Sequence, residues 1–378
     1  MERVTLSSIN QYVSATVNPA DTPEDIFELY SVPSYENQYP EIVKGKEIGS
    51  AKAVVQEGDV LICKINPKIN RVWVVKHNTE YPLLASSEWI VVRNSAINSN
   101  YLKWYFMSPF FRKLLTSQVA GIGGSLTRAQ PKQVAKYPVP IVELEKQGKI
   151  VNLLEKVNFV ISARQQQLAK LDELAKARFV EMFGDISIND KEWNVEPLGR
   201  LCTIVRGASP RPIEKYLGGD VPWIKISDAT QGENIYLNKT KEYIIQEGVS
   251  KSRKVKSGSL IFANCGVSLG FARIITFDGC IHDGWLAMED IDERVNKIFL
   301  LQALNQMTEH FREIAPAGTQ PNLNTTIMKE YKQIIPPMRL QEEFVGFIER
   351  ADKLRLQIEK SLEKSETLKK SLMQQYFE

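Results

Sequence analysis

Two long stretches of the sequence repeat apolar residues at alternating steps of four and three, as in helices that pack against another helix. The first stretch runs from Ile150 to Met182, and eight of its ten repeating positions are apolar. The second runs from Phe344 to Tyr376 and weakens toward its end. The pattern predicts two long helices. We call the repeating positions the helix-pair seam, and its main apolar members are Ile150, Leu154, Val157, Ile161, Leu168, Leu171, Phe344, Ile348, Ile358, Leu362 and Leu372.

Further apolar residues lie beside the seam and are expected to widen the buried side of each helix. The two seams have equal length, which favours packing of the helices against each other. The alternative is that each helix is buried separately on its own globular region. The flanking residues are Leu153, Val160, Leu174, Phe347, Leu354 and Leu368.

The rest of the chain reads as two globular regions with short runs of β-branched and aromatic residues, which predict strands. Such runs occupy residues 72–75, 89–92 and 272–275. Each region is expected to close with one helix, at residues 99–117 and 296–314. The predicted fold class is α+β, present twice.

The second half of the chain repeats the first. Residues 150–158 (IVNLLEKVN) match residues 344–352 (FVGFIERAD) at a shift of 194, and the register holds as far as Phe183 and Phe377. Upstream, residues 58–62 match 258–262, and residues 140–144 match 336–340. A duplication of this length predicts two copies of one structural unit.

The repeat predicts four segments. They are a first globular region at residues 1–142, a central helix at 143–185, a second globular region at 186–338 and a C-terminal helix at 339–378. A helix of about 40 residues is roughly 60 Å long. An antiparallel coiled coil of the two helices would give a pseudo-two-fold arrangement with the regions held apart. This suits a bipartite ligand such as duplex DNA, whose successive major-groove faces are about 34 to 36 Å apart.

Composition excludes the unusual protein classes. The 378 residues are 43% hydrophobic and 25% charged, as in an ordinary globular protein. No apolar run is long enough to span a membrane, and the first residues do not form a signal peptide, so a cytoplasmic location is expected. The four cysteines are too sparse for a disulfide framework. The net charge of +3 neither favours nor excludes a polyanionic partner.

Few residues of the sequence are candidates for a catalytic site. His77, His282 and His310 form no metal-binding motif, so no metal site is predicted. Residues 121–124 (GIGG) have the composition of a phosphate loop without its spacing. The adjacent His282 and Asp283 are the best acid–base pair, but no nucleophile motif accompanies them. The chain alone is therefore not expected to be an enzyme.

Local groups of basic and amide side chains are candidates for DNA contact. They lie in a loop at residues 64–71, a loop at 206–211, a basic run at 251–256 and two later loops. Solvated faces, ion-paired turns and Asx turns are the alternatives. The predicted DNA-binding residues are Lys64, Asn66, Lys68, Asn70, Arg71, Ser125, Arg128, Arg206, Ser209, Arg211, Lys225, Lys251, Arg253, Lys254, Asn264, Gln320, Asn322 and Asn324.

Several local stretches, together with the duplication, resemble one known family. Residues 47–50 (EIGS) and 58–67 (GDVLICKINP) carry the resemblance in the first half, and Trp193, Leu198, residues 207–210 (GASP) and residues 219–224 (GDVPWI) carry it in the second. Over essentially its whole length, the chain resembles the specificity subunit of type I restriction-modification systems.

This resemblance implies a DNA-binding subunit without catalysis of its own. Each recognition region would read one half of an asymmetric bipartite site in double-stranded DNA. Two methyltransferase subunits would dock on the helices, and restriction subunits would complete the complex. No cofactor is expected on this chain, because S-adenosylmethionine for adenine-N6 methylation, ATP and magnesium would belong to those partner subunits.

One departure from the family pattern concerns the N-terminus. The first region begins at Glu2 without the tryptophan-containing lead that Trp193 gives the second region. Either the N-terminal edge is built differently, or it is ordered by the C-terminal helix. Two other functions stay open at this point, namely a coiled-coil scaffold that does not bind DNA and a specificity module of another restriction-enzyme type.

Overall fold

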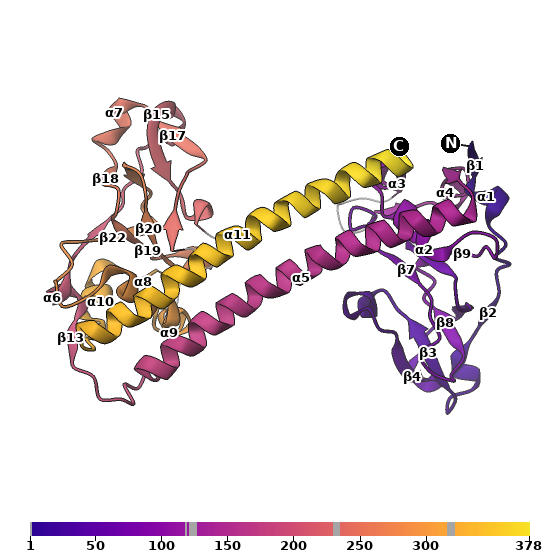
Figure 1. Cartoon of the computed structure of the whole chain (residues 1–378), viewed down its shortest axis with the longest axis horizontal. Coiled ribbons are helices and arrows are strands. Elements are labelled where there is room, and N and C mark those ends of the chain that lie inside the picture. Colours follow the sequence, from indigo (N-terminus) through magenta and orange to yellow (C-terminus); the bar gives the residue numbers. More distant parts are fainter. Residues whose placement is uncertain (1, 118, 121–126, 230–234, 316–321) are drawn as a thin grey trace. The chain divides into compact units, whose positions relative to one another are not determined.

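The computed structural model describes residues 2–117, 119–120, 127–229, 235–315 and 322–378. The chain divides into two compact units. Unit 1 comprises Met1–Arg164 with Ser361–Glu378, and unit 2 comprises Gln165–Lys360. The long helices α5 (Leu144–Phe183) and α11 (Met338–Phe377) each have 40 residues, and each contributes one end to each unit (Figure 1).

In unit 1, apolar runs form the centre of the globular region. The strands β7 (Val72–Val74), β6 (Val60–Cys63) and β9 (Trp89–Val92) lie in that order and pair antiparallel. Since these strands are almost wholly buried, both faces of this sheet are covered. A second sheet has the order β2 (Thr16–Val17), β5 (Lys52–Val54), β8 (Leu83–Ala85), β3 (Ile26–Tyr30) and β4 (Glu41–Lys44).

Shorter elements complete unit 1. The strand β1 (Glu2–Thr5) pairs with β12 (Pro138–Ile141), and β10 (Val119–Ala120) pairs with β11 (Arg128–Ala129). The short helices are α1 (Leu6–Ile9), α2 (Ser99–Phe106), α3 (Pro109–Ser117) and α4 (Pro131–Val134).

Unit 2 is built in a similar way. One sheet has the order β14 (Thr203–Arg206), β22 (Trp285–Glu289), β19 (Leu260–Ala263), β20 (Ala272–Ile275) and β16 (Tyr236–Leu237). Another has the order β17 (Glu242–Ile244), β15 (Leu217–Ile224), β21 (Gly279–Ile281) and β18 (Arg253–Val255). The unit also contains the paired strands β13 (Val195–Pro197) and β23 (Lys332–Ile334) and the α-helices α6 (Leu198–Leu201), α7 (Gln246–Val249), α8 (Lys297–Gln306), α9 (Thr308–Ile314) and α10 (Thr325–Glu330).

The predicted strands and long helices are present, but the prediction of one closing helix per region was wrong. Each closing segment is two helices, α2 with α3 in unit 1 and α8 with α9 in unit 2. In unit 1 the break precedes Pro109, whose ring and missing N–H prevent the helix from continuing through it. In unit 2 it falls at Met307.

The helix-pair seam lies on the buried side of both helices. Every seam residue that we predicted is buried or half-buried. In unit 2, Arg355 bonds to Asp172 and Arg178 pairs with Glu343 at 2.9 Å, so the two helices run antiparallel within this unit. In unit 1, Lys369 Nζ donates to Asn158 Oδ1 at 2.6 Å.

The prediction that the flanking residues widen the buried side of each helix was wrong for all of them except Phe347. A two-helix contact covers only a narrow seam, which leaves the positions beside it in solvent. Only Phe347 packs against a core, that of unit 2. The exposed flanking residues are Leu153, Val160, Leu174, Leu354 and Leu368.

The structure also corrects the sequence match that paired residues 140–144 with residues 336–340. Leu6 N donates to Tyr137 O in unit 1, and Leu198 N donates to Tyr331 O in unit 2. The shift of 194 therefore already holds between Tyr137 and Tyr331, so residue 142 corresponds to residue 336 and not to residue 338. The shared proline and leucine residues had favoured the wrong alignment.

Among the described residues, no helix combines the length and the apolar character needed to cross a membrane.

Candidate nucleic-acid interface

In unit 1 the candidate residues at 64–71 form a loop that leaves the end of β6. The backbone of Lys64 donates to Glu88 O at 3.0 Å and accepts from Ala129 N at 2.8 Å. Asn66 N donates to Thr127 O at 2.9 Å, and Ile65 forms a β-bridge with Arg128. The buried strand thus holds this loop beside the segment that carries Arg128.

The polar side chains of this loop have different roles. Arg71 pairs with Glu36 at 3.2 Å, and Arg128 pairs with Glu88 at 3.1 Å. Asn70 Nδ2 donates to Phe106 O at 3.1 Å, so its amide fastens the loop to α2. Within the described part of the chain, Lys64 and Lys68 form no ion pair. Unlike Arg71 and Arg128, they would not have to leave a carboxylate partner to bind a ligand.

An equivalent loop follows β19 in unit 2. Asn264 N donates to Gly284 O at 2.9 Å, and Asn264 O accepts from Leu323 N at 2.8 Å. Cys265 forms a β-bridge with Asn322. The backbone pattern is the same as in unit 1, so Asn264 takes the place of Lys64 and Asn322 takes the place of Arg128.

Two of the residues predicted to contact DNA form hydrogen bonds within the protein. Asn264 is fully buried, and its Nδ2 donates to Asn322 Oδ1 at 3.2 Å. Asn324 caps α10, since its Oδ1 accepts from Ile327 N at 2.9 Å. A base edge cannot reach Asn264 in this conformation, because side chains of the protein surround it.

Asp283 organises the basic loop at residues 206–211. Arg206 Nε donates to its backbone oxygen at 3.1 Å, Ser209 Oγ donates to its carboxylate at 2.9 Å, and Arg211 pairs with that carboxylate at 3.4 Å. Burial would raise the pKa of Asp283, but the hydrogen bond from Ser209 and the nearby cations outweigh burial and lower it. The carboxylate therefore stays ionised. Asp283 holds the Arg206 guanidinium through its backbone oxygen and the Arg211 guanidinium through its carboxylate.

His282 adjoins this carboxylate. Its Nδ1 accepts from Gly284 N at 2.9 Å, and its Nε2 lies 2.9 Å from Asp283 Oδ1. Burial lowers the pKa of His282, and the attraction of Asp283 offsets this only in part. The neutral imidazole, with its proton on Nε2, fits both contacts.

The basic run at 251–254 lies beside the same loop. Ser252 Oγ donates to Ala208 O at 2.7 Å, and Lys254 on β18 lies opposite Cys280 on β21. Lys251 hydrogen-bonds to Tyr216 OH, with its Nζ 4.8 Å from the ring centroid. Arg253 is exposed. The fold thus brings together two groups of cations that are about 45 residues apart in sequence.

Lys225 occupies the strand end next to His282. Its Nζ lies 2.5 Å from Glu242 Oε1 and 5.4 Å from the ring centroid of Trp223. Ser125 and Gln320, which we also predicted to contact DNA, lie outside the described residues, as do residues 121–124.

Sequence reasoning missed the acidic residues that organise these cations. The sequence pattern indicated Asp283 only as half of an acid–base pair, and it gave no role to Glu88 or Glu36. One signal could have indicated an acidic partner. The 206–211 loop carries two arginines, and such cations need a counter-charge once the loop folds. In the described residues there is no group of three His, Cys, Asp or Glu side chains suited to holding a metal ion.

Comparisons with known proteins connect this geometry with one family. Residues 190–370 match the family model described as the type I restriction modification DNA specificity domain. The MjaIX specificity subunit of Methanocaldococcus jannaschii, a type I restriction enzyme subunit, is 24% identical over 49% of this chain and 43% of its own length. A putative type I specificity subunit of Haemophilus influenzae, S.HindORF215P, is 23% identical over 70% of this chain and 67% of its own length.

Solved structures share the fold. A chain from a study of complex assembly and conformational transition of the type I R-M system covers 100% of this chain and 97% of its own length, with 17% identity and a TM-score of 0.63. The type I S subunit from M. genitalium covers 100% of this chain and 96% of its own length, with 13% identity and a TM-score of 0.58. Together these findings confirm the resemblance seen in the sequence: residues 190–370 match the DNA specificity domain of type I restriction-modification systems, the curated relatives are type I specificity subunits, and the solved structures share the fold.

Proposed function

We propose that this chain reads double-stranded DNA for a type I restriction-modification complex and has no catalytic activity of its own. The observation that carries the proposal is the pair of equivalent loops after β6 and β19. Each loop is fixed by the same backbone bonds to a second polar segment, and each lies in a different unit. Two recognition regions of one design suit the two halves of an asymmetric bipartite site.

In unit 1 the contacts are assigned to the loop at 64–71 and to Arg128. Lys64 and Lys68 are suited to phosphate oxygens, because a lysine acts as a compact point charge. Asn66, at the turn of the loop, is suited to a base edge. Arg71 and Arg128 would exchange their carboxylate partners for DNA, so they contribute less net affinity than the lysines.

In unit 2 the contacts are assigned to the surface around Asp283. Arg206 and Arg211 carry planar guanidinium groups that match guanine or phosphate in a bidentate way. The remaining contacts are assigned to Ser209, Lys225, Lys251, Arg253, Lys254 and Asn322.

The long helices are proposed to pair as one antiparallel coiled coil that sets the DNA spacer between the two regions. In this proposal the recognition regions are residues 1–142 and 186–338, and the helical segments are 143–185 and 339–378. The exposed apolar side chains of the two helices, both those beside the seam and those on the outer side, would be covered by two methyltransferase subunits. They are Leu153, Phe159, Val160, Leu174, Val180, Leu354, Leu356 and Leu368.

The chemistry is proposed to belong to the partners. Methyltransferase subunits would bring S-adenosylmethionine for adenine-N6 methylation, and restriction subunits would bring ATP- and magnesium-dependent activity. The proposed role of this chain is to direct those subunits to the DNA sequence that it recognises.

The test is to reconstitute the chain with its methyltransferase subunits and to map methylated adenines in a genome by long-read sequencing. We expect one bipartite motif, together with DNA affinity that falls steeply as salt rises. Inserting one heptad into both helices should lengthen the spacer and leave the bases unchanged. Affinity independent of salt, with no methylated motif, would favour a scaffold that does not bind DNA.

A further inference from the structure

One buried glutamine occupies the same position at the start of each long helix. Gln147 is the fourth residue of α5, and Gln341 is the fourth residue of α11. The shift between them is 194, the shift of the repeat. Their exposed fractions are 2% and 0%. We call Gln147 and Gln341 the junction glutamines, and neither belongs to the candidate nucleic-acid interface.

In unit 1 the carboxamide of Gln147 joins the starts of two helices. Its Oε1 accepts from Asn98 N at 2.9 Å, and its Nε2 donates to Val142 O at 2.8 Å. Asn98 is the N-cap of α2, where its side chain accepts from two backbone N–H groups. Val142 lies just before α5. The planar amide therefore fixes the entry of the long helix against the entry of α2.

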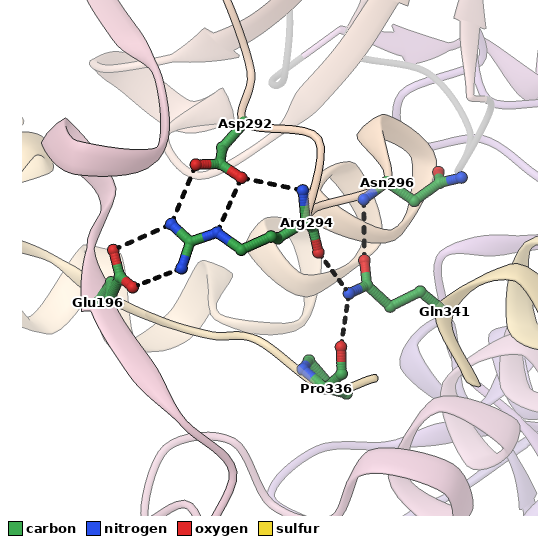
Figure 2. Close-up of polar contacts among 6 residues, drawn as sticks. All are labelled: Glu196, Asp292, Arg294, Asn296, Pro336 and Gln341. Carbon is green, nitrogen blue, oxygen red and sulfur yellow. Dashed lines mark hydrogen bonds and ion pairs between the residues drawn. The ribbon is translucent and has the colours of Figure 1, made fainter. Parts of the chain in front are cut away.

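Unit 2 contains the same junction with one more bond (Figure 2). Gln341 Oε1 accepts from Asn296 N at 2.8 Å, and Nε2 donates to Pro336 O at 2.7 Å and to Arg294 O at 2.9 Å. Asn296 is the N-cap of α8. The recurrence of one side chain with the same two classes of partner, in two diverged copies, indicates a shared role.

The helices α2 and α8 connect these junctions to the candidate DNA loops. In unit 1, α2 packs against β6 and β7, and the loop at 64–71 leaves β6 and returns through β7. In unit 2, α8 packs against β20, which pairs with β19, the strand that precedes Asn264. A rotation of the long helix about its first turn would therefore change the direction of the helix relative to the recognition loop.

We infer that the junction glutamines are positioning residues that fix the direction in which each long helix leaves its recognition region, and thereby the DNA spacer length that the complex accepts. This inference rests on the proposed function. A buried amide with a donor and an acceptor accepts one arrangement of its partners, whereas an apolar side chain of similar size would pack in several.

The test uses the full complex with the methyltransferase subunits. Gln147→Met and Gln341→Met remove both hydrogen-bonding groups at nearly constant volume, and Gln166→Met on α5 and Gln357→Met on α11 are matched controls at exposed positions. DNA affinity is measured on duplexes that carry the wild-type motif with its own spacer and with spacers one and two base pairs shorter or longer.

We expect the double junction variant to bind the wild-type spacer at least about tenfold more weakly than the double control, because two buried N–H groups lose their acceptors. The preference among spacer lengths should flatten while the preferred bases stay the same. Equal weakening at every spacer length would contradict a positioning role, as would an unchanged spacer profile. If the wild-type complex shows no sequence-specific binding, the proposed function fails, and this inference fails with it.

A distance measurement without DNA distinguishes failure of the positioning role from failure of the proposed function. Nitroxides at Lys68→Cys and Glu155→Cys, with the half-buried Cys265 replaced by serine, report the distance between the recognition loop and α5 within unit 1. Gln147→Met should broaden the distribution of this distance, and Gln166→Met should leave it unchanged. A distribution as narrow as in the parent protein would overturn the positioning role even if DNA binding changed. A single variant that unfolds unit 1 would show that the glutamine serves stability and would likewise overturn it.

Discussion

In unit 2 the last turn of α5 is held by residues that follow it in the chain, whereas in unit 1 the last turn of α11 is held by the beginning of the chain. Trp193 Nε1 donates to Phe183 O at 2.9 Å, and Lys191 Nζ donates to Glu181 O at 2.6 Å. In unit 1, Arg3 Nη2 donates to Glu378 O at 2.6 Å and Phe377 O at 3.3 Å. Both solutions satisfy carbonyl groups that a helix end leaves without partners.

The N-terminal edge of unit 1 contacts the last turn of α11. Arg3 supplies a cation at the negative end of this helix. Arg3 also lies over the ring of Phe110, 4.7 Å from its centroid. These contacts support the alternative in which the C-terminal helix orders the N-terminal edge.

The turns before α2 and α8, where the long helices start, also differ between the two units. Ala96 N donates to Asn94 Oδ1 at 2.9 Å in unit 1, and Arg294 N donates to Asp292 Oδ1 at 2.9 Å in unit 2. Only the second turn carries a guanidinium, which also pairs with Glu196 on β13 at 2.7 Å. The hydrogen bond and charge of Arg294 lower the pKa of Asp292 to about 2. Unit 2 thus adds ion pairs to a junction that unit 1 builds from backbone and amide groups.

The largest expected effect comes from placing a charge at equivalent seam positions. Leu154 is 0% exposed in the core of unit 1, and Ile348 is 3% exposed in the core of unit 2. Leu154→Asp and Ile348→Asp should each cost more than about 4 kcal/mol, because no partner compensates the buried carboxylate. Hydrogen exchange followed by mass spectrometry should show loss of protection in unit 1 for the first variant and in unit 2 for the second.

Leu174→Asp is the control, since Leu174 is 51% exposed and the change should cost less than about 0.5 kcal/mol. If each of the variants Leu154→Asp and Ile348→Asp removed protection from both units, the two units would not be separate cores.

A smaller effect is expected at the helix ends. Phe377 packs against Tyr101 and Tyr105, with ring centroids 5.6 and 5.7 Å away, and Phe183 packs against Phe299 at 4.8 Å. Phe377→Ala should destabilise unit 1 by about 3 kcal/mol, near the lower end for a buried phenylalanine, because a helix end can relax into the space. Phe183→Ala should cost more, since the chain continues beyond it and restricts relaxation.

Thermal unfolding of the two variants measures this difference, and Arg3→Ala separates the contribution of the cation from that of the ring. A loss of stability in Phe377→Ala equal to that of Arg3→Ala would show that the polar contact, and not the aromatic packing, holds the end of α11.

The sequence predicted the long helices well because forty residues of one period leave little ambiguity, and α5 and α11 begin and end close to the expected residues. It failed for the leucines beside the seam, since hydrophobicity alone does not say whether the partner that covers a side chain belongs to the same chain. It also overlooked the break before Pro109, where the apolar pattern continued and suggested one helix.

The candidate site was less predictable. Amide side chains have the same donors and acceptors wherever they lie, so Asn264 and Asn70 looked like base readers although they bond to groups 58 and 36 residues away. The junction glutamines were invisible for the same reason, since Gln147 contacts Asn98 across 49 residues.

At the DNA surface, the comparison predicts that one cation in each unit affects a different half-site. Lys64→Ala and Arg211→Ala should each weaken binding by about 1 to 2 kcal/mol, because each removes one cation. Footprints of the complex should lose protection at one half-site for Lys64→Ala and at the other for Arg211→Ala. Lys146→Ala, an exposed change on α5, is the control. Loss of the same half-site in both variants would refute the assignment of one unit to each half.

The smallest expected effect is a response to acid in unit 2 alone. Burial lowers the pKa of His282 below its ordinary value of 6.5, so on acidification the unfolded chain takes up this proton before the folded chain does. Unit 2 should therefore lose stability as the pH falls from about 7.5 toward 5.5. Protonation at Nδ1 would also break the hydrogen bond that Gly284 N donates to it.

Hydrogen exchange at several pH values, corrected for the intrinsic rates, tests this difference between the units. In His282→Gln, which cannot titrate, the stability of unit 2 should depend less on pH over this range, while that of unit 1 should stay as in the parent protein. Asp283, whose pKa is also lowered, contributes only at more acidic pH, because its stabilising charge is lost as the pH falls through a value below 3.8. A loss of stability between pH 7.5 and 5.5 that persists in His282→Gln would therefore place the acid response outside the His282–Asp283 pair.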